Sequence, residues 1–324
     1  MKLIAPIVFL LTLLVAGLLG FLWWNSATAA PGTSSEEVRF TITRGSSAET
    51  IGKNLKEAGL IRDTFALKIY LQSKGLVAKL PPGQFKIAKN LKLPELVSVL
   101  LKGPVELWVT IPEGLRREQY PEIFAAGLEL SPADATSFEE EFLLATENLE
   151  GFLYPDTYLF PPNVTAEQVI SVLRNTFDKK FTPTQEELDA VGLTLDEAVT
   201  LASIIERETR NASERPTVVG VYLNRLGADW PLQADATIQY VTGDSEDWWK
   251  TPTTAQKEVN SFYNTYKYPG LPPAPIANPS LTSLEAVINP EDTDFWFYLH
   301  DPDGVIHFAQ TLEEHNLNVQ RYLR

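Results

Sequence analysis

The hydrophobic positions of this 324-residue chain begin as one unbroken run and become periodic only later. No charged residue lies between Leu3 and Trp24, and Lys2 precedes the run. About 20 apolar residues are enough for a helix to cross the hydrocarbon core of a bilayer. Trp23 and Trp24 end the run, where interfacial aromatic residues are favoured. We therefore expect residues 1–25 to form a single transmembrane anchor, with Lys2 cytoplasmic and the remaining chain outside the cytoplasm.

A cleaved signal peptide is the alternative, because Ala27-Thr28-Ala29 has the small side chains of a cleavage site. The apolar segments of signal peptides are about 7–15 residues long, which favours the uncleaved anchor. Both interpretations export the body of the protein. Residues 26–37 are small and polar, and we interpret them as a linker.

Periodic patterns after the linker predict a small α/β module at residues 38–104. Val38, Phe40 and Ile42 alternate with polar residues, as in a half-buried strand. Asp63 precedes a helical pattern in the position of an N-cap. A short strand is expected within residues 81–90, and a helix is expected over 93–102, before Gly-Pro.

The remaining residues, 105–324, predict a larger and mostly helical domain. It opens with a strand at 107–111 and is helical in pattern up to residue 226. Proline-rich loops follow, and two strands at 295–299 and 305–308 are joined by "HDPDG", which has good turn chemistry. The expected fold class is therefore α+β: an anchor, a small α/β module, and a helical domain with a C-terminal β-hairpin.

Composition excludes several classes of function. The formal net charge is −15, whereas nucleic-acid binding requires clustered lysine and arginine. No cysteine is present, so disulfides and thiolate chemistry are excluded. The three histidines, His300, His307 and His315, lack the spacing of a zinc-protease helix, and we predict no metal and no cofactor.

The stretch "LASIIERET" (201–209) carries the candidate chemistry. Thr194 and Glu197 form a capping-box pattern, so a helix should begin at about Leu195 and include this stretch. Its two acids, Glu206 and Glu208, interrupt an otherwise apolar sequence.

Helical geometry separates the two acids. At about 100° per residue, Glu206 stands over the small residues Ala202 and Ser203, whereas Glu208 lies on a more mixed face. Small neighbours leave space before the Glu206 carboxyl, and an apolar wall would favour its protonated form, which suits a general acid. The alternative is that Glu206 is a buried structural acid paired with an arginine (Arg210, Arg215 or Arg225). Glu208 is expected to be structural in either case.

Segments that combine aromatic rings with amides indicate sugar binding, because rings pack on the apolar faces of pyranoses and amides bond hydroxyl or N-acetyl groups. They lie in "EGFLYPDTYLF" (150–160), "VVGVYLNRL" (218–226), "PLQADATIQY" (231–240) and "FYNTYKYPGLPPAPIANPS" (262–280). Surface loops rich in turn residues are the alternative. Together with the serine beneath Glu206, the predicted substrate-binding residues are Tyr154, Ser203, Asn224, Gln233, Asp235, Thr237, Tyr263 and Asn264.

These motifs, with "LASIIERET", "YNTYKYPGLPPAPIANP" and the closing "HFAQTLEEHN", occur in an order that resembles the endolytic murein transglycosylase (YceG-like) family. The resemblance covers about residues 105–324. It implies a membrane-anchored lytic transglycosylase, a carbon-oxygen lyase that cuts the MurNAc-GlcNAc β-1,4 bond of nascent peptidoglycan and leaves 1,6-anhydroMurNAc ends. It also implies a LysM-like module at 38–104, cell-wall synthases as partners, and Glu206 as the catalytic residue.

The implied reaction needs one carboxylic acid, which acts first as acid and then as base. A muramidase-type hydrolase using Glu206 with Asp235 is an alternative, because ordinary glycosidases need two carboxylates. A non-catalytic glycan-binding scaffold is another. One departure from the family pattern is visible, since many members have proline after the Leu-Gln-x-Asp segment and this chain has Ala236.

Overall fold

The structure, a computed structural model, describes residues 4–43, 45–77 and 79–323 and divides into two compact units. The first unit extends to Leu107 and includes Leu159–Val164, and the second comprises Trp108–Tyr158 and the chain from Thr165 onward. Mixed helix and sheet is observed, as predicted for the fold class. Lys2, predicted to be cytoplasmic, lies outside the described residues.

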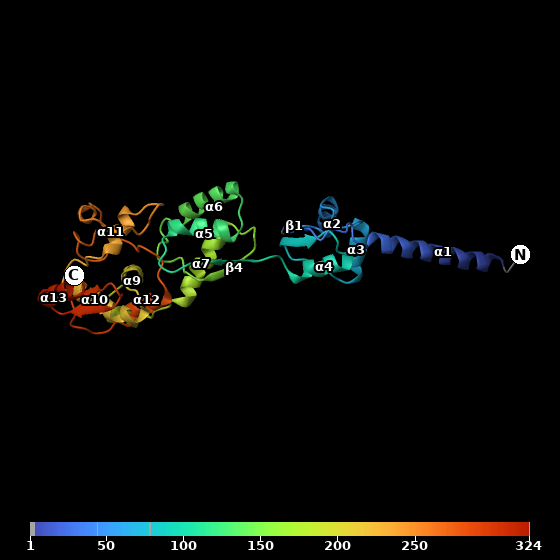
Figure 1. Ribbon diagram of the computed structural model, residues 1–324. Coiled ribbons are helices and arrows are strands. Elements are labelled where there is room, and N and C mark those ends of the chain that lie inside the picture. The colour runs from blue at the N-terminus through green and yellow to red at the C-terminus, as the bar shows by residue number, and fades with distance from the viewer. Residues whose placement is uncertain (1–3, 44, 78, 324) are drawn as a thin grey trace. The chain divides into compact units, whose positions relative to one another are not determined.

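The first unit combines an apolar helix with a small strand-helix-helix-strand module (Figure 1). Strands β1 and β2 are antiparallel, with Phe40 opposite Phe85, and the Asp63 carboxylate accepts hydrogen bonds from two backbone amides at the start of α3. The predicted strands, helices and N-cap are thus confirmed, while the LysM-like character stays a prediction. The elements are α1 (Ile4–Ala27), β1 (Glu37–Ile42), α2 (Ala48–Glu57), α3 (Thr64–Ser73), β2 (Gly83–Ala88) and α4 (Leu93–Lys102).

The C-terminal end of α1 is part of the core of this module. Ala27 is buried and Trp24 packs against the same cluster of apolar side chains. The backbone oxygen of Thr28 accepts a hydrogen bond from the Leu93 amide at 3.0 Å, and the Arg62 guanidinium donates to the Ala30 oxygen at 2.9 Å. The first residues of the expected linker are therefore held against the module. Residues 9–27 have the length and composition of a membrane span, features that signal sequences share.

The second unit is mostly helical and is organised around α9 (Figure 1). Leu201, Ile204 and Ile205 of α9 are fully buried, and α9 packs against α10, α11 and α12. The small sheet β5–β6 completes the unit. The helices and strands that follow α4 in the chain are β3 (Leu107–Thr110), α5 (Tyr120–Gly127), α6 (Pro132–Ala145), β4 (Thr157–Phe160), α7 (Ala166–Lys180), α8 (Gln185–Val191), α9 (Leu195–Glu208), α10 (Arg215–Gly227), α11 (Asp235–Thr242), α12 (Leu281–Ile288), β5 (Phe297–His300), β6 (Ile306–Ala309) and α13 (Leu312–Tyr322), with 3-10 turns at Arg117–Gln119, Ala212–Glu214 and Gln256–Glu258.

The structure confirms two local predictions in the second unit. The capping box of Thr194 and Glu197 is present, and α9 begins at Leu195. The C-terminal hairpin is present, with β5 antiparallel to β6.

Candidate active site

Glu206 lies in an ionic, hydrogen-bonded environment. Its Oε1 is 3.1 Å from Nη2 of Arg215, and both side chains are only 8% exposed. Its Oε2 accepts hydrogen bonds from the Ser280 amide at 2.9 Å, the Ser280 hydroxyl at 2.5 Å and the Ser283 hydroxyl at 2.8 Å. Both carboxylate oxygens are therefore occupied by partners from α10 and from the start of α12.

A glycine turn covers the same side chain. Gly114 has a φ of +73°, and a Cβ added there would lie 3.3 Å from Cγ of Glu206. The turn is fixed by a hydrogen bond of 2.8 Å from the Gly114 amide to the Asn278 oxygen. The expectation of open space before Glu206 in an apolar wall is thus wrong, because residues distant in sequence fill that space. The ion pair with Arg215, the alternative interpretation, is confirmed.

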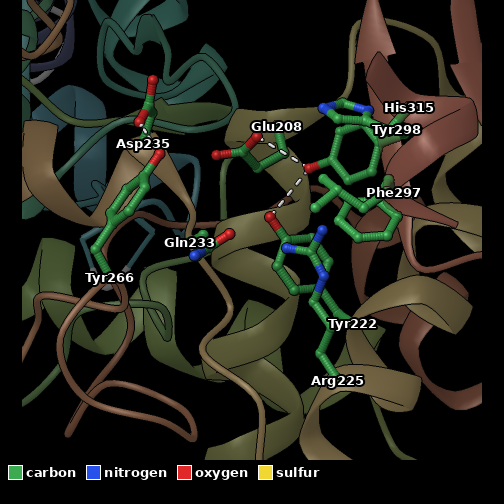
Figure 2. A pocket seen from close by; sticks show the side chains of 10 residues that line it. Glu208, Tyr222, Arg225, Gln233, Asp235, Tyr266, Phe297, Tyr298 and His315 are labelled. Carbon is green, nitrogen blue, oxygen red and sulfur yellow. Dashed lines mark hydrogen bonds between the residues drawn. The ribbon is translucent and has the colours of Figure 1, made fainter. Parts of the chain in front are cut away.

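Glu208 lines a cavity of about 350 Å³ (Figure 2). Its carboxylate accepts a hydrogen bond from the Ala236 amide at 3.3 Å and one from the Tyr298 hydroxyl at 3.1 Å. The Tyr298 hydroxyl also lies 3.0 Å from that of Tyr222. The cavity is lined by Glu208, Tyr222, Arg225, Gln233, Asp235, Tyr266, Phe297, Tyr298, Leu312 and His315.

The environment of Glu208 favours its protonated form. Burial raises the pKa of this carboxyl above the ordinary value, and the nearby charge of Asp235 raises it further. The hydrogen bonds from Ala236 and Tyr298 and the charge of His300 lower the pKa of Glu208 only in part. Glu208 therefore keeps its proton to higher pH than an exposed glutamate, and it does so beside a space that can admit a ligand.

Asp235 and Gln233 line the same cavity as Glu208, and Figure 2 shows Asp235 to the left of Glu208 with Gln233 below them. Its Oδ1 is 2.6 Å from Nζ of Lys257 and accepts a hydrogen bond of 2.5 Å from the Tyr266 hydroxyl. Asp235 is thus paired with a cation, whereas the hydrogen-bond partners of Glu208 are a backbone amide and a hydroxyl. Gln233 and Asp235 are the predicted substrate-binding residues that the structure brings together with Glu208.

The side chains of the two predicted asparagines donate hydrogen bonds to backbone oxygens instead. The side-chain amide of Asn224 donates to the oxygens of Thr293 and Phe295, at 2.7 and 3.0 Å. That of Asn264 donates to the oxygens of Lys257 and Val259, at 2.9 and 2.8 Å. These bonds hold the loops that surround the cavity, and the prediction of direct substrate contact finds no support in them.

The two predicted hydroxyl residues are fully buried. Thr237 donates to the Ala234 oxygen at 2.8 Å and bonds the hydroxyl of Thr265 at 2.9 Å. Ser203 donates to the Thr200 oxygen at 2.7 Å and accepts from the Ile276 amide at 3.0 Å. Neither side chain lines the cavity of Glu208.

The predicted tyrosines lie elsewhere in the second unit. Tyr154 is 6% exposed and packs into the hydrophobic core. Tyr263 packs against Tyr240 with ring centroids 4.9 Å apart and the ring planes tilted by 37°, and both line a separate cavity of about 280 Å³. Glu150 also lines that cavity, and burial raises its pKa to about 8.

Sequence reasoning missed most of the side chains around Glu208. Tyr266 stands in a segment that was selected for its aromatic residues, so composition could have found it. Tyr222 and Arg225 share a helical spacing that resembles an ordinary core face. Tyr298 comes from β5, 90 residues beyond Glu208, and no local pattern connects the two. In the part of the chain that the structure describes, no cluster of acids and histidines could hold a metal ion.

Comparisons with known proteins agree on one family. The sequence pattern of the YceG-like family matches residues 40–321. The chain is similar to an endolytic murein transglycosylase of Streptococcus pneumoniae serotype 2 (strain D39 / NCTC 7466), with 28% identity over 362 aligned residues that cover 99% of this chain. It is also similar to an endolytic murein transglycosylase of Bacillus subtilis (strain 168), with 28% identity and coverage of 90% of this chain and 86% of the relative.

A solved structure indicates the same family. The chain is 29% identical to a yceG-like protein, lmo1499, from Listeria monocytogenes, with a TM-score of 0.57 and coverage of 88% of this chain and 99% of the other. This chain spans 65% of the length of the Streptococcus pneumoniae relative.

The buried pair of Glu206 and Arg215 should contribute strongly to stability. We expect Arg215→Met to lower the free energy of unfolding by about 3–5 kcal/mol, because it leaves a buried carboxylate without its cation. Urea unfolding of the folded protein measures this change. The double variant Arg215→Met with Glu206→Gln should lose less than the sum of the single losses, since the unpaired charge is then also removed.

An exposed ion pair provides the control. Lys180 and Asp156 lie 3.8 Å apart and are 48% and 42% exposed, so Lys180→Met should cost less than about 1 kcal/mol. If Arg215→Met proves as mild as Lys180→Met, the structural role assigned to the buried pair is incorrect.

Proposed function

This chain belongs to the YceG-like family, and we propose that it is a membrane-anchored lytic transglycosylase that cuts within peptidoglycan glycan strands. The bond cleaved is the β-1,4 bond between MurNAc and GlcNAc, and the product carries a 1,6-anhydroMurNAc end. The names of the relatives from Streptococcus pneumoniae and Bacillus subtilis support the activity. The observation that carries the mechanism is a cavity with a proton-retaining carboxyl, Glu208, in its wall.

Glu208 acts first as an acid and then as a base. Its carboxyl gives a proton to the glycosidic oxygen as the bond to C1 of MurNAc breaks. The resulting carboxylate accepts the proton of the C6 hydroxyl, whose oxygen closes onto C1. Protons balance and no water is consumed. General acids work best when their pKa lies near the working pH, and the raised pKa of Glu208 moves in that direction.

Glu206, the residue implied by the motif resemblance, is the rival for this role. Four contacts, from Arg215, Ser280 and Ser283, already occupy its carboxylate. A hydroxyl or a sugar oxygen would have to displace one of these partners and the Gly114 turn to reach it. Glu208 has one hydrogen-bond partner on each oxygen and no cation paired with it in the described residues, and it lines the cavity, so we assign the proton transfer to Glu208.

The presence of Asp235 in the same cavity favours a second candidate, a muramidase-type hydrolase that uses two carboxylates. The contacts of Asp235 argue against a role as nucleophile. Lys257 and Tyr266 both bind Oδ1 of Asp235, which lowers its reactivity. We assign Asp235 and Gln233 to the orientation of the sugar, by hydrogen bonds to its hydroxyl or N-acetyl groups.

The apolar helix α1 serves as an uncleaved anchor, with the second unit outside the cytoplasm. Support comes from the module, whose core includes Ala27 and whose α4 amide bonds the Thr28 oxygen. Cleavage after Ala29 would remove these contacts. An anchored enzyme of this kind would work on new glycan strands beside membrane-bound cell-wall synthases.

Substitution of the two acids tests the assignment. We expect Glu208→Gln to lower turnover by about 10²–10⁴-fold, because the shape remains and the transferable proton is lost. Glu206→Gln should retain measurable turnover in whatever fraction stays folded. Mass spectrometry of peptidoglycan digests measures both variants, with circular dichroism to verify the fold.

The same digests separate the candidate functions. Anhydro ends identify a lytic transglycosylase, reducing ends identify a hydrolase, and uncut strands indicate a scaffold that only binds glycan. An inactive, folded Glu206→Gln variant beside an active Glu208→Gln variant would transfer the catalytic role to Glu206.

The pH dependence should shift in opposite directions for two kinds of variant. Activity requires protonated Glu208, so kcat/KM should fall as pH rises through the pKa of that group. Tyr298→Phe and Ala236→Pro each remove a hydrogen bond that lowers this pKa, and the alkaline limb should move to higher pH. Asp235→Asn removes a charge that raises the pKa of Glu208, and the limb should move to lower pH. Shifts of the same sign in all three variants would contradict the assignment.

The anchor is tested by the N-terminus of the mature protein. We expect protein isolated from membranes to yield a continuous peptide across Ala27-Thr28-Ala29, because Ala27 is part of the module core and the Thr28 oxygen is bonded by the Leu93 amide. Peptide mapping by mass spectrometry measures this directly. A new N-terminus immediately after Ala29 in all of the mature protein would instead identify a signal peptide.

A further inference from the structure

An aromatic groove lies next to the cavity of Glu208. We call it the tryptophan groove and define it by its lining residues, Ala228, Trp230, Trp296, Phe297, Gln310, Thr311 and Leu312. It has a volume of about 510 Å³. None of these side chains carries a charge, which argues for a neutral ligand rather than an ion or a charged peptide.

The tryptophan groove and the cavity of Glu208 are neighbours that share two lining side chains. Phe297 of β5 and Leu312 of α13 line both spaces. Figure 2 shows Phe297 beside Arg225 and His315, on the side of the cavity away from Asp235. A chain molecule bound at Glu208 can therefore extend over Phe297 into the groove without leaving the surface of this unit.

The walls of the groove are fixed by a buried arginine. Arg225 is 8% exposed and donates to the Trp296 oxygen through Nε and Nη2, at 3.0 and 2.7 Å. Its Nη1 donates to the Leu232 oxygen at 2.6 Å, and its own oxygen accepts from the Trp230 amide at 2.8 Å. Both tryptophans are thus attached to one buried group, and a preorganised wall loses less entropy when it binds a ligand.

The rings form a packed platform. The Trp230 ring centroid lies 5.4 Å from that of Trp296 and 5.4 Å from that of Phe297, the latter edge to face. Flat apolar rings bind the C–H faces of a pyranose, while the side chains of Gln310 and Thr311 at the edge can bond its hydroxyl groups. A sugar ring satisfies both parts of this surface.

We propose that the tryptophan groove is an additional sugar subsite, which holds a pyranose of the same glycan strand beyond the bond that is cut. The proposal rests on the proposed function, because it identifies the strand bound at Glu208 with the strand bound in the groove. It explains how an enzyme can favour the interior of a strand over its ends, since an interior bond has sugar on both sides to fill the groove.

The test measures glycan binding in a protein that cannot cut. Peptide-free glycan strands and N-acetylglucosamine oligomers of increasing length are titrated into the Glu208→Gln variant by calorimetry. Affinity should rise when the oligomer becomes long enough to reach the groove. Adding Trp230→Ala should weaken binding of the long oligomers by about tenfold and leave the short ones unchanged, as expected for loss of one aromatic contact.

Two further variants separate binding from folding. Trp230→Tyr keeps an aromatic face and should restore most of the length dependence. Trp108→Ala removes a tryptophan that is 67% exposed and lines neither space, and it should change nothing. Equal affinity for long and short oligomers, or an unchanged length dependence in a folded Trp230→Ala variant, overturns the subsite.

The two proposals fail in different ways. If the wild-type protein leaves glycan strands uncut while length-dependent binding is lost in Trp230→Ala, the subsite stands and the lytic activity is wrong. If the wild-type protein forms anhydro ends while Trp230→Ala cuts long and short strands in the same ratio as the wild type, the activity stands and the subsite is wrong.

Discussion

The spacing of two acids on a buried helix determines the organisation of the site. Residues two positions apart on an α-helix point about 200° away from each other, so Glu206 and Glu208 cannot share an environment. α9 lies in the core, with Leu201 and Ile205 fully buried. The two acid side chains therefore contact different sets of packed elements. One acid meets Arg215 and the start of α12, and the other meets the cavity. Glu206 holds the loop before α12 against α9, and Glu208 is the acid to which we assign the proposed proton transfer.

Two buried arginines connect this helix to the rest of the unit. Arg215 joins α10 to Glu206 and to the hydroxyl of Ser280, so the loop before α12 is held against α9. Arg225, further along α10, binds the Trp296 oxygen just before β5. That contact positions β5, and β5 carries the Tyr298 hydroxyl to the carboxylate of Glu208. The acid and the aromatic wall therefore depend on the same short segment of backbone.

Local signals in the sequence were sufficient for the elements, but they carried no information about the surroundings of either acid. The capping box of Thr194 and Glu197 predicted the start of α9, because it involves residues three apart. The position of Glu206 above Ala202 and Ser203 was also reasonable helical geometry. What occupies the space before that carboxyl comes from Ser280 and Ser283, 74 and 77 residues away. Periodicity carries no information about contacts at that separation, so it could not distinguish an occupied carboxyl from an available one.

Ala236, the residue after Asp235, has a chemical role that is visible only in the folded structure. The family pattern that this chain resembles implies proline at this position, and from the sequence Ala236 removes no reactive group. In the structure the Ala236 amide donates to the carboxylate of Glu208 at 3.3 Å, a bond that proline cannot make. This bond lowers the pKa of Glu208 while burial and Asp235 raise it. The pKa of Glu208, the proposed acid, therefore depends on opposing contributions, and the hydrogen bond from the Ala236 amide is one of them.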